Sequence, residues 1–252
     1  MGITGIVQAR LGSSRLPRKV LLDICGRPSL GIQFDRLRKC RNLEKIVLAT
    51  TTSEADVELV DFATAEGIKC FRGSESDVLD RFYQAAKSVG AEHICRLTAD
   101  CPLSDPVEID RVASSYLNNI SKYSYVHRGE TYPEGLAECE FFSFASLEVA
   151  WKEAKSQVER EHVTQFFFRN AQRFSRLTVE YKRDLSKLRV GLDEPVDLEV
   201  IRILVGRLGA GVKTGIEEIA SFLEANEDVC RINNSIIRNE GLAISLAKKY
   251  EG

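Results

Sequence analysis

The chain has 252 residues, of which 44% are hydrophobic and 29% are charged, and its formal net charge is −2 at pH 7. This composition is ordinary for a globular protein. The near-neutral charge argues against the general polyanion-binding surface of a nucleic-acid-binding protein. The longest apolar runs are far shorter than the ~20 residues that a membrane span needs.

The N-terminus and the cysteines indicate a cytoplasmic protein. The first four residues contain no basic stretch that leads into an apolar run, so no secretory signal is apparent. The seven cysteines are scattered singly, without a Cys-x-x-Cys pair. This usage is typical of a reduced compartment and argues against a zinc site.

Strands and helices alternate along the first half of the chain. Short apolar segments predict strands at 3–8, 45–50, 70–71 and 93–97, and apolar residues at helical spacing predict helices between them. Asp105 and Pro106 supply the N-cap and first position of a further helix that runs to about residue 118. This alternation predicts an α/β fold with a mostly parallel sheet and helices on both faces. Ligands of such sheets bind beyond the carboxyl ends of the strands, so the loops there are the candidate site.

The second half of the chain has a different pattern. Residues 123–144 contain strand-like segments rich in Tyr, Val and Phe, which we interpret as a small insertion. Further helices are predicted at 146–155, 159–171 and 195–203, and further strands at 177–181 and 188–190. The pattern of residues 215–249 predicts helices and no strand. We therefore divide the chain into a domain at 1–214, with its insertion at about 123–144, and a helical C-terminal tail at 215–252.

A basic loop follows the first predicted strand. Between Arg10 and Lys45 the sequence has ten basic residues against three acidic ones, which favours a compact anion such as a triphosphate. A loop between a strand and a helix can offer several backbone N–H groups to phosphate oxygens. The loop matches neither a P-loop nor a dinucleotide motif, and a plain basic surface loop remains the alternative. Its candidate phosphate contacts are Arg10, Gly12, Ser13, Arg15 and Lys19.

Two aspartates follow predicted strands. Asp100 ends the fourth strand, and it is not needed as a helix cap because Asp105 fills that position. Asp193 follows the segment 188–190 and would complete a magnesium site, since Mg²⁺ binds through one or two carboxylates plus phosphates and water. Alternatively, Asp193 caps the next helix and Asp197 serves its first turn. The local pattern leaves both interpretations open.

Seven short motifs occur in a characteristic order along nearly the whole chain. They are Gln8-Ala9-Arg10-Leu11-Gly12-Ser13-Ser14-Arg15-Leu16-Pro17, Ala49-Thr50-Thr51-Thr52, Phe71-Arg72-Gly73-Ser74, Asp77-Val78-Leu79-Asp80-Arg81, Thr98-Ala99-Asp100-Cys101-Pro102-Leu103, Arg160-Glu161-His162-Val163-Thr164 and Asp193-Glu194-Pro195-Val196-Asp197-Leu198. This order resembles the cytidylyltransferases that include the acylneuraminate and 3-deoxy-manno-octulosonate enzymes. It is most similar to the spore-coat polysaccharide biosynthesis branch, which the tail segments 232–234 and 238–241 also resemble.

The resemblance implies a Rossmann-like nucleotidyltransferase that dimerises through an inserted element. It implies that an oxygen of an acidic sugar or phosphorylated acceptor attacks the α-phosphorus of CTP and expels pyrophosphate, with Mg²⁺ as cofactor. By matched position, Asp100 and Asp193 bind the metal, and Lys19 and Arg10 act in catalysis. The implied nucleotide contacts are Ala9, Arg10, Ser13, Arg15, Lys19, Thr50, Arg72, Asp77 and Arg81. The residues implied around the acceptor and the dimer insertion are Arg128, Glu138, Glu140, Glu161 and His162.

Two segments depart from the family pattern. Arg18 stands where the family usually has a glycine, so it is strained if that position has positive φ, and otherwise it adds a phosphate contact. The segment 133–140 matches the family's acceptor motif only with a one-residue insertion. A glycosyltransferase is the alternative enzyme, although the Asp-x-Asp motif that such enzymes often use is absent. A catalytically silent nucleotide-binding module is the alternative from another class.

Overall fold

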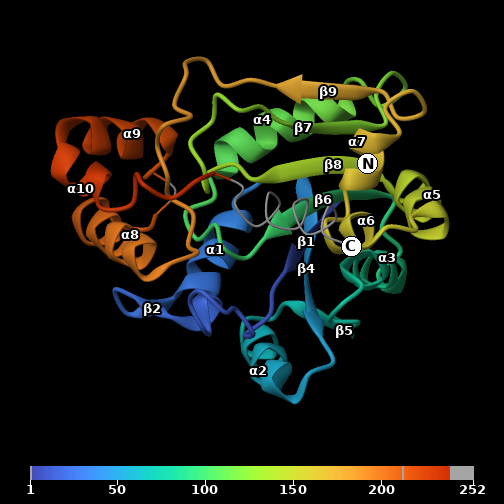
Figure 1. The fold of residues 1–252 in the computed structure, drawn as a ribbon, viewed down its shortest axis with the longest axis horizontal. Helices are drawn as coiled ribbons and strands as arrows, with labels where there is room; N and C mark the ends of the chain where they lie inside the picture. Colours follow the sequence, from blue (N-terminus) through green and yellow to red (C-terminus); the bar gives the residue numbers. More distant parts are fainter. Residues whose placement is uncertain (1, 212, 239–252) are drawn as a thin grey trace, which may run out of the picture.

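A seven-stranded sheet organises the computed structural model, which describes residues 2–211 and 213–238 (Figure 1). The strand order is β5-β4-β1-β6-β8-β7-β9. Six of these strands run in one direction, and β8 alone among the seven is antiparallel to its neighbours. The predicted mostly parallel α/β fold is therefore confirmed. The strands are β1 (Ile3–Gln8), β4 (Leu43–Thr51), β5 (Lys69–Gly73), β6 (His93–Thr98), β7 (Tyr125–Arg128), β8 (Cys139–Ser143) and β9 (Arg176–Val179).

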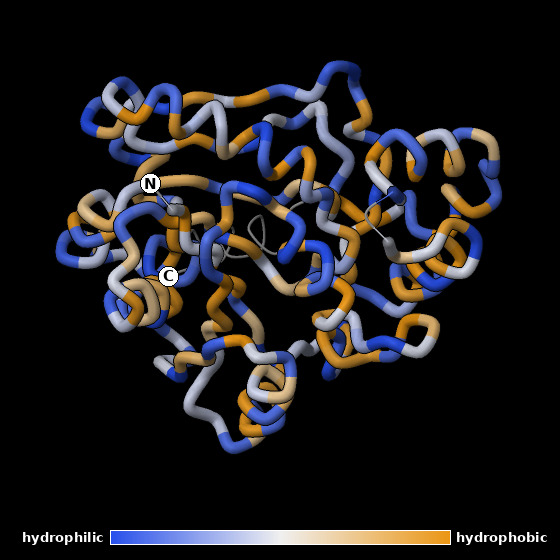
Figure 2. Tube along the Cα trace, turned by 180° about the vertical axis from the view of Figure 1, so that it is seen from behind, coloured by the Kyte–Doolittle hydropathy of each residue, from blue (hydrophilic) through white to orange (hydrophobic). Residues whose placement is uncertain are grey.

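Helices cover both faces of the sheet because successive strand residues point to opposite sides. On β1, Ile3 and Val7 belong to one buried cluster and Ile6 belongs to the other. The first cluster includes α1 (Ser29–Leu37), α2 (Val57–Ala65), α4 (Pro106–Leu117) and α8 (Pro195–Leu208), and the second includes α3 (Val78–Ser88), α5 (Phe144–Glu153) and α7 (Gln165–Arg169). Apolar and polar stretches alternate along the outer helices (Figure 2), as expected when one side of each helix packs on the sheet.

Three local features of the structure differ from the sequence prediction. A hairpin of β2 (Asp23–Ile24) and β3 (Arg27–Pro28) was not anticipated; its turn contains Cys25 and Gly26, both at positive φ. The helix predicted at 159–171 is two short helices, α6 (Gln157–Glu161) and α7, separated by a backbone turn at Val163 with φ 44°. The strand predicted at 188–190 is wrong, since the segment forms one isolated bridge between Glu134 and Arg189.

The segment 123–144 forms part of the central sheet, because it supplies β7 and β8. Four of its aromatic residues are fully buried within the single chain, with 0% exposure for Tyr125, Tyr132, Phe141 and Phe142, whereas Tyr123 and Phe144 are half-buried. These four side chains are therefore not available to a partner subunit, although the resemblance implied dimerisation through an inserted element. The homodimer stays a prediction that needs support from elsewhere in the molecule.

The described part of the C-terminal tail packs on the main core. It comprises α9 (Ile216–Ala225) and α10 (Glu227–Arg231), and Ile219 and Leu223 belong to the same buried cluster as α1 and α4. The division at residue 214 stays a prediction, and the helix and motif expected beyond residue 238 lie outside the described residues. Within the described ranges, no helix is long and apolar enough to cross a membrane.

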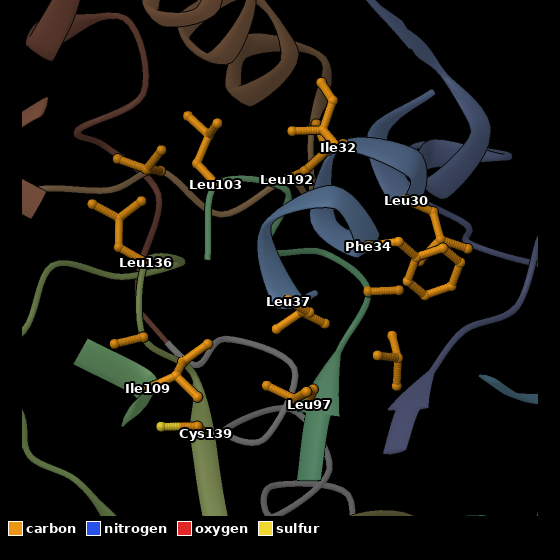
Figure 3. Packing of buried hydrophobic residues seen from close by; sticks show 14 of the residues in the cluster. Leu30, Ile32, Phe34, Leu37, Leu97, Leu103, Ile109, Leu136, Cys139 and Leu192 are labelled. Atoms are coloured by element: carbon orange, nitrogen blue, oxygen red, sulfur yellow. The ribbon is translucent and has the colours of Figure 1, made fainter. Parts of the chain in front are cut away.

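One part of the core supports the loops at the carboxyl end of the sheet. Figure 3 shows Leu37 of α1 close to Leu97 of β6, with Leu103 and Leu192 from two loops in the same cluster. These leucines flank the aspartates that the sequence singles out, at positions 100 and 193. The two loops are distant in sequence, but both bury a leucine in the cluster that also contains α1.

Candidate active site

The site lies where the strand order reverses. From β1, the chain builds β4 and β5 on one side and then returns to place β6 on the other. Gln8 at the end of β1 is in register with Thr98 at the end of β6. The loops that leave these two strands diverge at this point, which makes it the expected ligand-binding crevice of such a sheet.

The basic loop after β1 is held in place by a buried carboxylate. The backbone N–H of Leu11 donates to Oδ1 of Asp56 at 2.7 Å, and Asp56 is 2% exposed. The backbone N–H groups of Ser13 and Arg18 in turn donate to the carbonyl of Leu11 at 2.9 and 3.1 Å. Asp56 therefore fixes the shape of the loop. Sequence reasoning missed it, because nothing near residue 56 marks it as a partner of residue 11.

Lys19, Asp100 and Asp193 come together at the crevice. Nζ of Lys19 lies 2.8 Å from Oδ1 of Asp193 and 3.5 Å from Oδ2 of Asp100. Nη2 of Arg15 lies 3.0 Å from the same Oδ1 of Asp193. The side chains of Lys19, Asp193 and Asp100 are 14%, 20% and 31% exposed, so the group is partly shielded from water but open on one side.

The loop that carries Asp193 is positioned by hydrogen bonds and not by a strand. The N–H of Leu192 donates to the carbonyl of Asp100 at 2.7 Å, which ties the two aspartate loops together. The N–H groups of Asp193 and Glu194 donate to Oδ2 of Asp197 at 2.9 and 3.0 Å. The proposed helix cap is thus supplied by Asp197, whereas the carboxylate of Asp193 pairs with cations from three other positions.

The charges of this group stabilise one another. Burial by itself would lower the pKa of Lys19, but the carboxylates of Asp100 and Asp193 raise it above its ordinary value. Burial by itself would raise the pKa of Asp100, but Lys19 and the neighbouring hydrogen bonds lower it. Lys19 is therefore an ammonium and Asp100 a carboxylate at neutral pH.

Two cavities meet at this group. The first, about 560 Å³, is lined by the predicted nucleotide contacts Ala9, Arg10, Ser13, Arg15, Lys19 and Arg81, together with Glu161 and His162. The second, about 460 Å³, is lined by the predicted acceptor residues Arg128, Glu138, Glu140 and His162. The residues that line both are Gln8, Arg15, Arg96, Thr98, Asp100, His162 and Asp193. Glu161, expected near the acceptor, therefore lies on the side of the basic loop.

Four predicted nucleotide contacts do not line either cavity. Thr50 is fully buried in β4, and the guanidinium of Arg72 donates to the carbonyls of Thr51 and Ser53. Asp77 caps α3 and forms an ion pair with Arg160 at 2.9 Å. The fourth is Gly12, where an added Cβ would approach only Glu75, at 3.9 Å. Burial thus accounts for Thr50, backbone hydrogen bonds for Arg72 and capping for Asp77, whereas the surroundings of Gly12 do not require a glycine.

Two arginines of the predicted nucleotide region behave differently. Arg81 is 3% exposed, and its guanidinium donates to the carbonyl of Ser74 and leaves the buried Nε without a hydrogen-bond partner. Arg18 adopts the left-handed conformation, with φ 60° and ψ 20°, where the family glycine would be unstrained. Its side chain pairs with Glu58 at 2.6 Å and lines neither cavity, so it adds no contact there.

The wall between the cavities is built around Glu140 and Arg96. Glu140 accepts hydrogen bonds from the hydroxyls of Tyr125 and Thr164 and pairs with Arg96. Nε of Arg96 donates to Oε1 of Gln8 at 3.2 Å. Glu140 thus positions other side chains, and it also lines the second cavity, where the resemblance implied that the acceptor binds. Sequence reasoning gave no role to Arg96; the available signal was a charged residue inside an otherwise apolar strand.

Two more arginines brace the second cavity. Arg128 pairs with Glu138 at 2.8 Å, and Glu138 also accepts from the N–H of Gly135 at 3.1 Å. Arg189, 7% exposed, contacts three carboxylates: Glu134 at 2.7 Å, Asp193 at 3.1 Å and Asp197 at 2.9 Å. Sequence reasoning missed Arg189: Asp193 and Asp197 follow it closely in the sequence, but Glu134 comes from a distant segment.

The donor set at the crevice suits a hard divalent cation. Asp100 and Asp193 both place an oxygen within 3.5 Å of one point, the position of Nζ of Lys19. No group of three His, Cys, Asp or Glu side chains that could hold a metal occurs among the residues that the structure describes. Two carboxylates are what Mg²⁺ takes from a protein when phosphates and water supply its other ligands.

The chain is similar to known proteins over most of its length. Residues 4–229 match the profile of the family described as Cytidylyltransferase. An uncharacterised protein of Methanocaldococcus jannaschii is 37% identical, covering 94% of this chain and 96% of that protein. The spore coat polysaccharide biosynthesis protein SpsF of Bacillus subtilis is 30% identical, covering 88% and 94%.

A solved structure extends the similarity to three dimensions. The structure of a cytidylyltransferase from Leptospira borgpetersenii is 28% identical and has a TM-score of 0.88, covering 94% of this chain and 100% of that chain. The family match over residues 4–229 includes both aspartate loops and every lining residue of the two cavities except Ile237. The chain therefore belongs to the cytidylyltransferase family.

Proposed function

We propose that the protein transfers CMP from CTP to an acidic sugar or a related precursor of surface polysaccharide, releasing pyrophosphate in a magnesium-dependent reaction. The observation that carries this proposal is the contact of Lys19, which lines the first cavity, with Asp100 and Asp193, which line both cavities. CTP and polysaccharide biosynthesis follow from the family and from the similarity to SpsF.

The first cavity suits the triphosphate. Arg10, Ser13 and Arg15 line it beside Lys19, and cations together with backbone N–H groups bind phosphate oxygens well. Lys19 is then placed to stabilise the negative charge that builds at the α-phosphate in the transition state. Asp100 and Asp193 would hold Mg²⁺, which when bound supplies further positive charge to the phosphate oxygens.

The second cavity suits a polyhydroxylated acceptor. Its lining is rich in paired polar groups, with Phe168 as an apolar surface, and sugars combine both kinds of contact. Carboxylates outnumber arginines in this lining, so an acidic acceptor would be bound by a particular arginine and not by net charge. Because the two cavities share a wall at Asp100 and Asp193, an acceptor oxygen would approach the α-phosphorus from the side opposite the basic loop.

The test is pyrophosphate release with each of the four nucleoside triphosphates, Mg²⁺ and a panel of acidic sugars and phosphorylated acceptors. We expect release with CTP and at least one acceptor, and loss of release when EDTA removes the metal. Equal thermal stabilisation by all four triphosphates, with no acceptor-dependent release, would contradict the proposal. The cytoplasmic location and the homodimer are also part of this proposal.

A further inference from the structure

Lys19 stands at the position that a bound metal would need. Its ammonium contacts Asp193 at 2.8 Å and Asp100 at 3.5 Å, and its side chain is 14% exposed. A divalent cation that binds both carboxylates must take over the same oxygens. Two cations cannot share this space, because the repulsion between them is strong where little water screens it.

The remaining contacts of Asp193 show which of its oxygens a metal and Lys19 would both need. Oδ1 of Asp193, which accepts from Lys19, also lies 3.0 Å from Nη2 of Arg15, and Oδ2 lies 3.1 Å from Nη2 of Arg189. Arg189 is 7% exposed and is held by Glu134 and Asp197 as well, so it is fixed. The oxygen that a metal can gain is therefore Oδ1, which Lys19 and Arg15 now contact. Lys19 is the cation of these two that also contacts Asp100, so binding of a metal to both carboxylates requires Lys19 to move away.

A triphosphate changes this balance. Lys19 and Arg15 both line the first cavity, where phosphate oxygens would give them new anionic partners. Because the protein supplies two carboxylates, the phosphates would also complete the ligand set of the metal. The same nucleotide thus removes the competing cation and adds ligands.

We propose that Lys19 and the divalent metal compete for the oxygens of Asp100 and Asp193, so that the metal binds tightly only when a triphosphate draws Lys19 away. Lys19 then has two successive partners: the two carboxylates without nucleotide, and the α-phosphate with nucleotide. This inference rests on the proposed function, since it takes Asp100 and Asp193 as the metal ligands. Its consequence is that free metal does not occupy the site ahead of the nucleotide, and by linkage each ligand strengthens the binding of the other.

The test measures Mn²⁺ binding by calorimetry and by its electron paramagnetic resonance signal, without nucleotide and with α,β-methylene-CTP, which cannot transfer CMP. For the wild type we expect the analogue to tighten Mn²⁺ binding. For Lys19→Met we expect tighter Mn²⁺ binding than wild type in the absence of nucleotide. The expected gain is about 5- to 150-fold, the usual range for coupled sites.

Arg10→Met is the matched control. Arg10 lines the same cavity but pairs with Glu75 at 3.1 Å, away from both aspartates. Its removal lowers the positive charge equally and should leave nucleotide-free Mn²⁺ binding nearly unchanged. An equal effect of Lys19→Met and Arg10→Met, or no effect of Lys19→Met, would overturn the competition.

Stability gives a second measurement. Removing Lys19 leaves two partly buried carboxylates facing each other, so Lys19→Met should melt at a lower temperature, and Mn²⁺ should raise that temperature more than it does for wild type. Lys19→Gln serves if the Met variant does not fold. Failure of the proposed function looks different: Asp100→Asn and Asp193→Asn would then leave Mn²⁺ binding in the nucleotide complex unchanged.

Discussion

Asp197 connects the stability of the protein to its candidate site. It is 0% exposed and pairs with Arg189 through two hydrogen bonds of 2.9 Å. It also accepts from the N–H groups of Asp193 and Glu194, and from Nδ2 of Asn233 at 2.8 Å. One carboxylate thus holds a buried arginine, the loop that carries a proposed metal ligand and a segment beyond α10.

Asp197→Asn removes this charge and replaces one accepting oxygen by a donor. Breaking a buried ion pair costs about 3–5 kcal/mol, and we expect about 3 kcal/mol, the lower end, because Glu134 and Asp193 still neutralise Arg189. In a chain of this size each kcal/mol lowers Tm by about 2–4 °C, so the expected loss is roughly 6–12 °C. Activity should fall as well, since the Asp193 loop loses its anchor.

Calorimetry at neutral pH and at acid pH checks the reasoning. Burial opposes ionisation of Asp197, but Arg189 and the loop N–H groups lower its pKa in the folded protein. Its contribution is therefore complete above the ordinary pKa of an aspartate and is lost as the pH falls through the lowered value. The Tm difference between wild type and Asp197→Asn should shrink correspondingly in acid.

Asp193→Asn is the control for this experiment. The side chain of Asp193 is 20% exposed and anchors no backbone group among the residues that the structure describes, so its loss should reduce activity with a clearly smaller change in Tm. A Tm of Asp197→Asn equal to that of wild type would refute the structural role of this residue. A larger Tm loss in Asp193→Asn would reverse the assignment of cap and metal ligand.

Four further predictions concern the site and the assembly. Lys19→Ala should lower turnover by about 10²–10³-fold while the Michaelis constant for CTP changes little; a raised Michaelis constant at unchanged turnover would show that Lys19 binds ground and transition states alike. Asp100→Asn and Asp193→Asn should each abolish most activity, and the double variant should be little worse than either, whereas multiplying losses would mean independent roles. Arg18→Gly should keep its activity and melt at or slightly above the wild-type temperature, because φ 60° suits glycine; a marked loss of CTP affinity would restore Arg18 as a phosphate contact. Sedimentation should show a dimer at micromolar concentration, and a fully active monomer would exclude it.

The sequence predicts most of the architecture because the signals are local. Alternating apolar strands and amphipathic helices predict the parallel sheet, and the cap at Asp105 is confirmed by its bonds to the N–H groups of Val107 and Glu108. The topology rule then places the loops after β1 and β6 at one crevice. Residues in those loops, such as Lys19 and Asp100, are therefore within reach of sequence reasoning.

Other features depend on contacts between segments that are distant in sequence. Thr50 and Arg72 belong to motifs, yet β-sheet packing buries one and backbone carbonyls engage the other. In the sequence, Arg96 and Arg189 look like ordinary charged residues. In the folded protein they pair with Glu140 and Glu134, which come from other segments. Burial makes an unpaired charge costly, so each buried arginine must find an anion, and which anion it finds depends on the tertiary structure.

Local patterns in the chain were enough to identify the fold class, the basic loop and the two aspartates as candidates. Only the tertiary structure shows that Asp193 contacts Lys19 although no strand precedes Asp193. Leu192 packs in the core and donates to the carbonyl of Asp100, and Asp197 anchors the following turn. The reason is that strands and helices are predicted from hydrophobic patterns of period 2 or 3.6, which involve only neighbouring residues. The closure of a loop instead depends on hydrogen bonds and burial against partners about a hundred residues away.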